Sequence, residues 1–552
     1  MKNKLFLTAA LLVAAVAQSW ACTNFIVGKK ASKDGSVIVS YSADSYGMFG
    51  QLYHYPATKH EKGAMRPIYE WDSGKYLGEI KEAEQTYNVV GNMNEFQVTI
   101  GETTFGGREE LHDKNGIMDY GSLIYVALQR SRTAKEAIKV MTDLVKEYGY
   151  YSSGESFSIA DPNEVWIMEM IGKGEGVKGA VWVAVRIPDD CIAAHANQSR
   201  IHRFPLNDKE NCLYSPDVIS FAREKGYFEG LNKDFSFADA YCPIDFGGLR
   251  ACESRVWSFY NMFCEGMGEK YLPYIQGKSK EPMPLYAKPT EKVSVRDIQK
   301  AMRDHYEGTA LDITNDLGAT AYKMPYRLSP LTFEVDGQKY FNERPISTQQ
   351  SAFAFVAQMR SELPDAVGGV LWFGTDDANM MAFTPVYCCT DRVPACYAGD
   401  GKADCVTFSW DSAFWIYNWV ADMIRPRYSL MIDDMRAVQN KLEDTYADSQ
   451  AGIENAAIAM HAQDPAKAKA FLTNYTEMTA QCAVDAWKKL GEYLIVKYND
   501  GVVKKTNADG SFVRPVYEHG ANAPLVRPGY PKEFLKEVVK ATGDRYKVYP
   551  LE

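Results

Sequence analysis

Cys22 is the residue whose surroundings in the sequence suggest chemistry most directly. Residues 1–21 have the pattern of a secretory signal peptide, with lysines at the start, an apolar run over residues 5–17 and small residues before the cysteine. Cleavage after Ala21 would make Cys22 the first residue of the mature chain. A cysteine in that position carries a nucleophilic thiol and a free α-amine together, so that it would hold its own general base.

The ordinary pKa values of these two groups suit such a reaction. A free α-amine has a pKa of about 7.7–8.0 and a free thiol one of about 8.5, so that both titrate close to neutral pH. Transfer of the thiol proton to the amine therefore needs no separate histidine. A neighbouring cation or hydrogen-bond donor would favour the thiolate further.

Cys22 also has two interpretations without catalysis. It could form a disulfide, which would leave an odd number among the remaining ten of the eleven cysteines. It could instead be the acylated cysteine of a lipoprotein, but lipidation favours an aliphatic residue three positions earlier, where this chain has Ser19. The lipid and catalytic interpretations exclude each other, because acylation of the amine would remove the base.

The other ten cysteines permit disulfides in an exported chain. Four of them cluster, namely Cys388, Cys389, Cys396 and Cys405. A zinc site is the alternative interpretation, but the cluster has no paired C-x-x-C elements and no nearby histidine. The sequence therefore favours disulfides over a metal site.

The composition is that of an ordinary globular protein and limits the possible partners. Hydrophobic residues make up 46% and charged residues 24% of the 552 residues, enough for a large core and more than one domain. The formal net charge of −10, without any block of Lys or Arg, argues against nucleic-acid binding. No later segment approaches the roughly 20 apolar residues of a membrane helix.

The residues after Cys22 have the pattern of a β-hairpin. Residues 23–29 and 36–42 are strand-like, and Lys33-Asp34-Gly35 between them is a turn sequence. Cys22 would therefore lie at the open end of a hairpin and be held by a sheet. Further strands are predicted at residues 156–160, 164–171, 180–187, 367–373 and 380–387.

Helices are predicted by their caps and by apolar spacing. Thr133 begins a capping box, and Ser294 caps a second helix. From about residue 412 to 490 the pattern is helical, with Pro426 and Pro465 as boundaries.

One glycine-rich motif points away from its usual function. Gly174-Glu-Gly-Val-Lys-Gly179 matches G-x-G-x-x-G, which binds dinucleotides when a strand precedes it and a helix follows it. Here residues 180–185 have the pattern of a strand, so we interpret the motif as a hairpin loop.

Several further motifs can be compared with known families. They are Cys22-Thr-Asn-Phe-Ile-Val-Gly with Ser42-Ala-Asp44, Gly101-Glu-Thr-Thr-Phe-Gly-Gly-Arg108, Ser156-Phe-Ser-Ile-Ala-Asp161, Ala196-Asn-Gln-Ser-Arg-Ile201, Ser254-Arg-Val-Trp257 and Thr384-Pro-Val-Tyr387. Together they resemble the PepD-type cysteine dipeptidases, N-terminal-nucleophile hydrolases related to penicillin V acylase and bile salt hydrolase. The resemblance implies an α+β fold of four αββα layers and the hydrolysis of dipeptides without a metal or cofactor. We expect a signal peptide over residues 1–21, this hydrolase domain over 22–410 and a mainly helical region over 411–552.

The resemblance also implies roles for individual residues. Cys22 would be the nucleophile, and Asp44 the acid that holds its amine and thiol in place. Asn197 would donate to the oxyanion, with Thr104 or its backbone as a second donor. Arg255 would be a cation near the nucleophile. Relatives in the wider superfamily often carry an arginine three residues before the aspartate, where this chain has a tyrosine. Stabilisation of the thiolate would then fall to Arg255.

Glu102 suggests how a dipeptidase would recognise its substrate. A carboxylate near the nucleophile would bind the free amine of a dipeptide through a charge-assisted hydrogen bond. We therefore expect Glu102, Thr103 and Thr104 to bind the substrate.

The sequence thus predicts an exported cysteine dipeptidase of relaxed specificity, periplasmic or secreted, that forms an acyl-thioester on Cys22. The first alternative is an amidase acting on N-acyl amides, as penicillin V acylase and bile salt hydrolase do. The second is a lipoprotein without enzymatic activity that is anchored through Cys22. For the dipeptidase and for the amidase, removal of residues 1–21 would itself activate the enzyme, because the α-amine that serves as the base is part of an amide until then.

Overall fold

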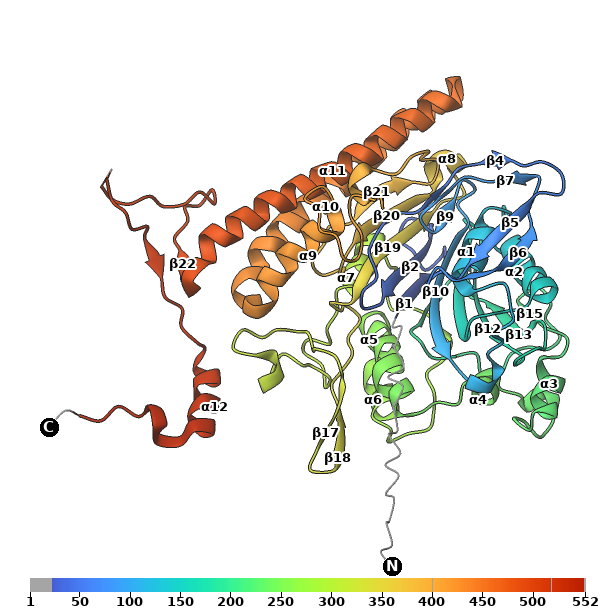
Figure 1. The fold of residues 1–552 in the computed structure, drawn as a ribbon, viewed down its shortest axis with the longest axis horizontal. Helices are drawn as coiled ribbons and strands as arrows, with labels where there is room; N and C mark the ends of the chain where they lie inside the picture. Colours follow the sequence, from blue (N-terminus) through green and yellow to red (C-terminus); the bar gives the residue numbers. More distant parts are fainter. Residues whose placement is uncertain (1–21, 400, 518, 551–552) are drawn as a thin grey trace, which may run out of the picture.

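Two antiparallel β-sheets form the centre of the molecule (Figure 1). The computed structural model describes residues 22–399, 401–517 and 519–550, so the expected signal peptide lies outside the described residues. In the order of their pairing, the strands of the seven-stranded sheet are β16 (Tyr286–Ala287), β14 (Ile192–His195), β1 (Thr23–Val27), β2 (Val37–Asp44), β19 (Ser351–Met359), β20 (Val370–Thr375) and β21 (Thr384–Tyr387). Those of the eight-stranded sheet are β15 (Cys212–Tyr214), β13 (Ala180–Arg186), β12 (Val165–Gly172), β11 (Gly154–Ala160), β10 (Thr99–Gly106), β9 (Met93–Asn94), β8 (Val89–Val90) and β3 (His54–Tyr55).

The predicted hairpin after Cys22 is confirmed. Strands β1 and β2 pair antiparallel with Thr23 opposite Ser42, so that Cys22 directly precedes the first strand. On its other side β1 pairs with β14, where Asn24 lies opposite His195. The start of β1 is therefore held on both sides within the sheet.

The two sheets pack against each other through β1, β2 and β10. Gly101 of β10 lets them approach closely, because a Cβ at this position would lie 2.6 Å from Asn24 Nδ2 of β1. His195 of β14 joins the sheets with two hydrogen bonds, one between Nδ1 and the Thr103 hydroxyl and one between Nε2 and the Ser158 hydroxyl, both at 2.7 Å. Nearly all side chains between the sheets are buried.

Helices cover the outer side of each sheet. Helix α2 (Ala134–Tyr148) contacts β11, β12 and β13 of the eight-stranded sheet. The seven-stranded sheet contacts α5 (Ser254–Phe263), α7 (Val295–Ala301), α9 (Ala413–Ile424), α10 (Tyr428–Gln463) and α11 (Pro465–Tyr498). The other helices are α1 (Tyr120–Leu128), α3 (Val218–Glu224), α4 (Phe237–Tyr241), α6 (Met267–Ile275), α8 (Asp365–Gly368) and α12 (Lys532–Thr542).

The long C-terminal helices α10 and α11 pack along each other and against β21 (Figure 1). Trp487 of α11 is fully buried, and its indole nitrogen donates to the Met380 carbonyl at 3.0 Å. The carboxylate of Glu443 on α10 accepts from Arg303 at 2.5 Å and from the backbone nitrogen of Phe383 at 2.9 Å. Within the described residues, no helix is both long and apolar enough to cross a membrane.

Most local signals in the sequence are confirmed. Helix α2 begins after Thr133, whose side chain accepts from the Glu136 backbone, and Ser294 forms a complete capping box with Asp297. Pro465 is the first residue of α11. The glycine-rich motif at 174–179 connects the antiparallel strands β12 and β13, as a hairpin loop does.

Other expectations need correction. The strands predicted at 367–373 and 380–387 are shorter, because Asp365–Gly368 forms a helix and the second strand spans only Thr384–Tyr387. The preference for disulfides is wrong, since all eleven cysteines are free thiols and most of them are buried singly among apolar side chains. Free cysteine packs in such places as a small apolar side chain.

The ion pair at Glu443 gives a prediction about docking of the C-terminal helices. We expect Glu443→Ala to lower the free energy of unfolding by about 3–5 kcal/mol, because it leaves the buried Arg303 guanidinium uncompensated. Chemical denaturation would measure the effect. Asp448→Ala, an exposed position on the same helix, is the control and should change stability by about 0.5 kcal/mol or less. Equal losses in both variants would contradict this role for Glu443.

His195 gives a prediction about acid stability. Burial, with Arg200 adding, lowers its pKa from 6.5 to about 3. Below pH 6.5 the unfolded chain therefore binds a proton that the folded chain does not, and the free energy of unfolding falls as the pH drops toward 3. We expect a loss of about 2 kcal/mol from this residue between pH 7.5 and pH 5.

Denaturant unfolding of the wild type and His195→Gln at both pH values isolates this contribution. The variant should be less stable at pH 7.5 but lose about 2 kcal/mol less on acidification. His519→Gln at an exposed position should keep the wild-type pH dependence. An unchanged pH dependence in His195→Gln would show that His195 is not the group responsible.

Candidate active site

The thiol of Cys22 lies in a buried polar site at the start of β1. The side chain is only 4% exposed. Its Sγ donates to Glu102 Oε1 at 3.5 Å and lies 3.7 Å from the Tyr41 hydroxyl. The Tyr41 hydroxyl donates to the same Glu102 oxygen at 2.6 Å. Glu102, selected from the sequence as a substrate-binding residue, therefore touches the nucleophile.

The surroundings of this thiol oppose its ionisation. Burial raises the pKa of Cys22 well above its ordinary value, and the negative charges of Glu102 and Asp44 raise it further. Hydrogen bonds from the Asp44 backbone and the Tyr41 hydroxyl lower the pKa by less. Without another group to accept its proton, Cys22 is therefore held as a neutral thiol.

Asp44 is fixed by an arginine that the sequence interpretation missed. One carboxylate oxygen accepts from Arg344 Nη2 at 2.6 Å and from the Ser42 hydroxyl at 3.1 Å. The other accepts from the Ser351 hydroxyl at 2.6 Å. Asp44 is fully buried, and this ion pair compensates its charge. Arg344 follows Asp44 by 300 residues, and no local pattern marks it.

Arg255 of α5 joins the start of β1 to the segment after β14. Its Nη1 donates to the Cys22 carbonyl at 2.7 Å and to the Thr23 hydroxyl at 2.8 Å. Its Nη2 donates to the Ala196 carbonyl at 3.0 Å and to Asn197 Oδ1 at 2.9 Å. Arg255 therefore lies near the nucleophile, as expected, where it positions the Cys22 backbone and the Asn197 side chain.

Asn197 is held in an unusual backbone conformation. Its φ angle of 62° lies in the left-handed region, which asparagine tolerates better than most residues. One hydrogen bond from Nδ2 goes to the Thr104 carbonyl at 2.7 Å, and an amide NH2 group has a second hydrogen to donate. The Thr104 hydroxyl itself donates to Glu155 Oε1 at 2.8 Å. This contact argues against the Thr104 hydroxyl as an oxyanion donor.

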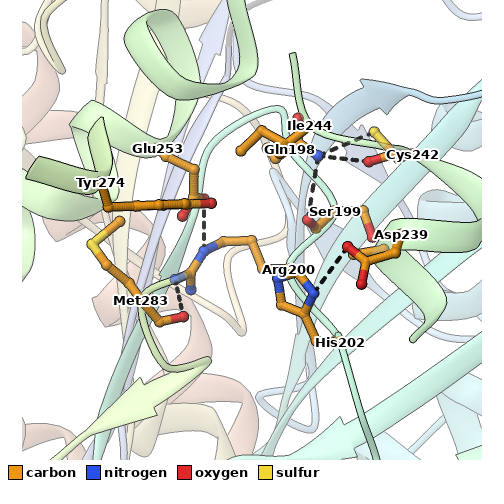
Figure 2. Close-up of a pocket in the computed structure, with 11 residues that line it drawn as sticks. Gln198, Ser199, Arg200, His202, Asp239, Cys242, Ile244, Glu253, Tyr274 and Met283 are labelled. Atoms are coloured by element: carbon orange, nitrogen blue, oxygen red, sulfur yellow. Dashed lines mark hydrogen bonds and ion pairs between the residues drawn. The ribbon is translucent and has the colours of Figure 1, made fainter. Parts of the chain in front are cut away.

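The residues after Asn197 anchor this segment (Figure 2). Arg200 Nε donates to Glu253 at 2.8 Å, and Gln198 Nε2 donates to the Cys242 carbonyl at 2.9 Å. The Ser199 hydroxyl donates to Glu169 at 2.5 Å. The cavity among these side chains has a volume of about 10 Å³, enough for one water molecule and too small for a peptide. The contacts of residues 198–200 therefore fix the position of Asn197.

Thr103 lies apart from the residues expected to bind substrate with it. Its hydroxyl is engaged with His195 between the sheets, and the side chain is fully buried. Through this hydrogen bond, Thr103 contributes to the packing of the two sheets.

An acidic cavity lies beside the nucleophile. It has a volume of about 210 Å³, and its lining includes Glu70, Asp72, Thr104, Tyr120, Tyr151 and Glu155. Glu155 is 1% exposed and interacts with Glu102, the carboxylate that touches Cys22. Burial raises the pKa of Glu155 well above its ordinary value, with the Glu102 charge adding to the shift.

The arrangement can perform nucleophilic catalysis. It combines a buried thiol, a side-chain amide joined to the Cys22 backbone through Arg255, and carboxyl groups that could bind a cationic part of a substrate. In the described parts of the chain, no group of three or more His, Cys, Asp or Glu side chains is arranged to hold a metal ion.

Comparisons with known proteins identify the family. The chain matches peptidase family C69 over residues 21–54 and 48–441. A "Probable dipeptidase" of Salmonella dublin is 27% identical over 404 residues, which cover 70% of this chain and 84% of that protein. A "Probable dipeptidase" of Latilactobacillus sakei is 26% identical over 485 residues, which cover 83% and 93%. A "Probable dipeptidase A" of Streptococcus pyogenes is 23% identical over 456 residues, which cover 79% and 87%.

The family match covers well over half of the chain and includes Cys22, Asp44, Glu102, Asn197 and Arg255. It confirms the family that the sequence motifs indicated. The chain therefore belongs to peptidase family C69 and is a hydrolase of the cysteine type.

Proposed function

We propose that this protein is an exported dipeptidase whose nucleophile is Cys22 at the N-terminus of the mature chain. The observation that carries the proposal is the contact of the buried Cys22 thiol with the Glu102 carboxylate at 3.5 Å. It places a group that binds an amine directly beside a group that attacks a carbonyl. The names of the relatives, which describe dipeptidases, support dipeptides as the substrates.

The reaction begins with removal of residues 1–21, which frees the α-amine of Cys22. This amine takes the thiol proton, and the thiolate attacks the carbonyl of the first substrate residue. Asn197 donates from its amide to the oxyanion that forms. The protonated amine then gives its proton to the leaving amino acid, and an acyl-thioester remains on Cys22. Water, activated by the same amine, hydrolyses that thioester.

The buried site explains why an amine base is needed. Burial and two carboxylates hold Cys22 as a neutral thiol, so the proton must leave as the bond to carbon forms. An α-amine with an ordinary pKa of about 7.7–8.0 is a much better acceptor for a thiol proton than a carboxylate. We therefore assign the base to the amine, and a different role to Glu102.

That role is recognition of the substrate. The α-ammonium group of a dipeptide is separated by one carbon atom from the carbonyl that Cys22 attacks. A carboxylate 3.5 Å from Sγ is close enough to bind this ammonium group while the carbonyl lies against the thiol. An N-acyl amide has no such ammonium group, so this contact favours a dipeptidase over an amidase.

The architecture fits this class of enzyme. Two antiparallel sheets pack together, with α2 against one and α5, α7 and α9–α11 against the other. We infer that these elements form the four αββα layers of an N-terminal-nucleophile hydrolase. The nucleophile then lies directly before a central strand, which pairs with a neighbouring strand on each side.

The first test concerns Cys22 itself. The mature protein should begin at Cys22 by N-terminal sequencing, and Cys22→Ala should lower kcat for dipeptides by at least about 10³-fold. A form that retains Ala21 before Cys22 should also be inactive, because its base is bound in an amide.

Cys482→Ala, at an exposed cysteine of α11, is the matched control and should keep full activity. Intact mass separates the alternative of a lipoprotein, since acylation adds a large increment to the mature chain. An active Cys22→Ala protein, or a mature form that begins elsewhere, would overturn the mechanism.

The second test concerns Glu102. We expect Glu102→Gln to lower kcat/KM for dipeptides by about 10–100-fold, the effect of a charged hydrogen bond of about 1.5–3 kcal/mol. N-acetylated dipeptides should be poor substrates of both proteins and show little difference between them, because they carry no ammonium group.

Glu84→Gln, an exposed glutamate outside the site, should behave as the wild type does. Unchanged kcat/KM for dipeptides in Glu102→Gln would contradict the proposed recognition. An equal loss for free and acetylated dipeptides would instead make Glu102 part of the proton transfer.

A further inference from the structure

The acidic cavity contains more carboxyl groups than one ammonium group requires. Glu102 lies at the thiol, and Glu155, Asp72 and Glu70 lie successively around the adjoining cavity. Two basic side chains lie close to these carboxyl groups: His112 lines the cavity, and Lys75 Nζ donates to the Tyr151 hydroxyl at 3.4 Å and lies over the Tyr151 ring.

Glu102 and Glu155 form a pair of buried carboxyl groups that hydrogen-bond to each other. Glu155 Oε1 also accepts from the Thr104 hydroxyl, and among the described residues neither Glu102 Oε2 nor Glu155 Oε2 has a further donor. The Glu155 side chain is 1% exposed and lines the cavity. Two adjacent buried carboxyl groups do not readily both carry a negative charge, so a cationic ligand that donates to them gains affinity. A cation in the cavity would also replace the proton that the raised pKa of Glu155 otherwise favours.

The walls of the cavity suit a long side chain with a charge at its end. The Tyr120 ring is largely buried, and its hydroxyl donates to Asp72 Oδ1 at 2.8 Å. The Tyr151 ring lines the same space. Aromatic faces pack against methylene groups and attract cations. The volume of about 210 Å³ is sufficient for one lysine or arginine side chain.

We propose that this cavity binds the side chain of the first substrate residue and selects a cationic one, lysine or arginine. The inference rests on the proposed function, in which Glu102 binds the α-ammonium group. The side chain branches from the same carbon as that group, so it can extend from Cys22 past Glu102 into the cavity. Its terminal cation then meets Glu155 and Asp72, whereas an apolar side chain supplies no positive charge to either carboxyl group.

The test compares two dipeptides that differ in the charge of the first side chain. The mature enzyme should hydrolyse lysyl-alanine with at least tenfold higher kcat/KM than norleucyl-alanine, whose side chain is of similar length and uncharged. Asp72→Asn should lower this ratio about tenfold, mainly through the KM of lysyl-alanine. Asp72 is exposed to the cavity, and an asparagine can still accept from Tyr120, so the fold should persist. Glu84→Gln should keep the wild-type ratio.

A ratio near one in the wild type would overturn the proposal. So would an equal loss for both dipeptides in Asp72→Asn, which would show that the cavity serves the α-ammonium group. Hydrolysis of norleucyl-alanine tests the proposed dipeptidase activity independently of the cationic site. If neither dipeptide is cleaved, calorimetric binding to Cys22→Ala still decides, because tighter binding of lysyl-alanine than of norleucyl-alanine supports the cationic site and equal binding refutes it.

Discussion

The geometry of the active site depends on the buried guanidinium of Arg255. This group donates to the backbone carbonyls of Cys22 and Ala196 and to the side chain of Asn197. Cys22 directly precedes β1 and Asn197 follows the neighbouring strand β14, and Arg255 hydrogen-bonds to both residues. Burial and the neighbouring charge of Arg344 lower the pKa of Arg255, and the oxygen atoms that accept from the guanidinium offset part of the cost of burying it. The same hydrogen bonds thus serve both stability and catalytic positioning.

The carboxyl groups around Cys22 fall into two sets, one paired with an arginine and one that has no basic partner among the described residues. Arg344 compensates Asp44, whereas Glu102 and Glu155 lie together and accept from the hydroxyls of Tyr41 and Thr104. The uncompensated side suits a substrate ammonium group, which brings the missing charge. The same carboxylates raise the pKa of the thiol and so prevent a free thiolate in the resting enzyme. In the proposed mechanism, activation of the thiol is therefore linked to an α-amine that would be free only after removal of residues 1–21.

Local patterns predicted local structure well. The hairpin of β1 and β2, the cap at Ser294 and the end of α10 before Pro465 all arise from turn and capping residues a few positions apart. Strand β19 was not predicted, because all nine of its residues are buried and none of the polar alternation of a half-buried strand remains. Strand β10 was not predicted either, because it contains two glycines and a glutamate, residues that strands usually disfavour.

The residues of the candidate site divide in the same way, into those that local motifs predicted and those that they did not. Cys22, Asp44, Asn197 and Arg255 were predicted because each lies in a short familial motif. Arg344, Glu155 and Asp72 were not, because they reach the site through tertiary contacts of long sequence separation. The residues that carry the chemistry shared by a family lie in short local motifs. The shape and charge of a substrate cavity come from side chains that several distant segments contribute, and they become visible only when the fold brings those segments together.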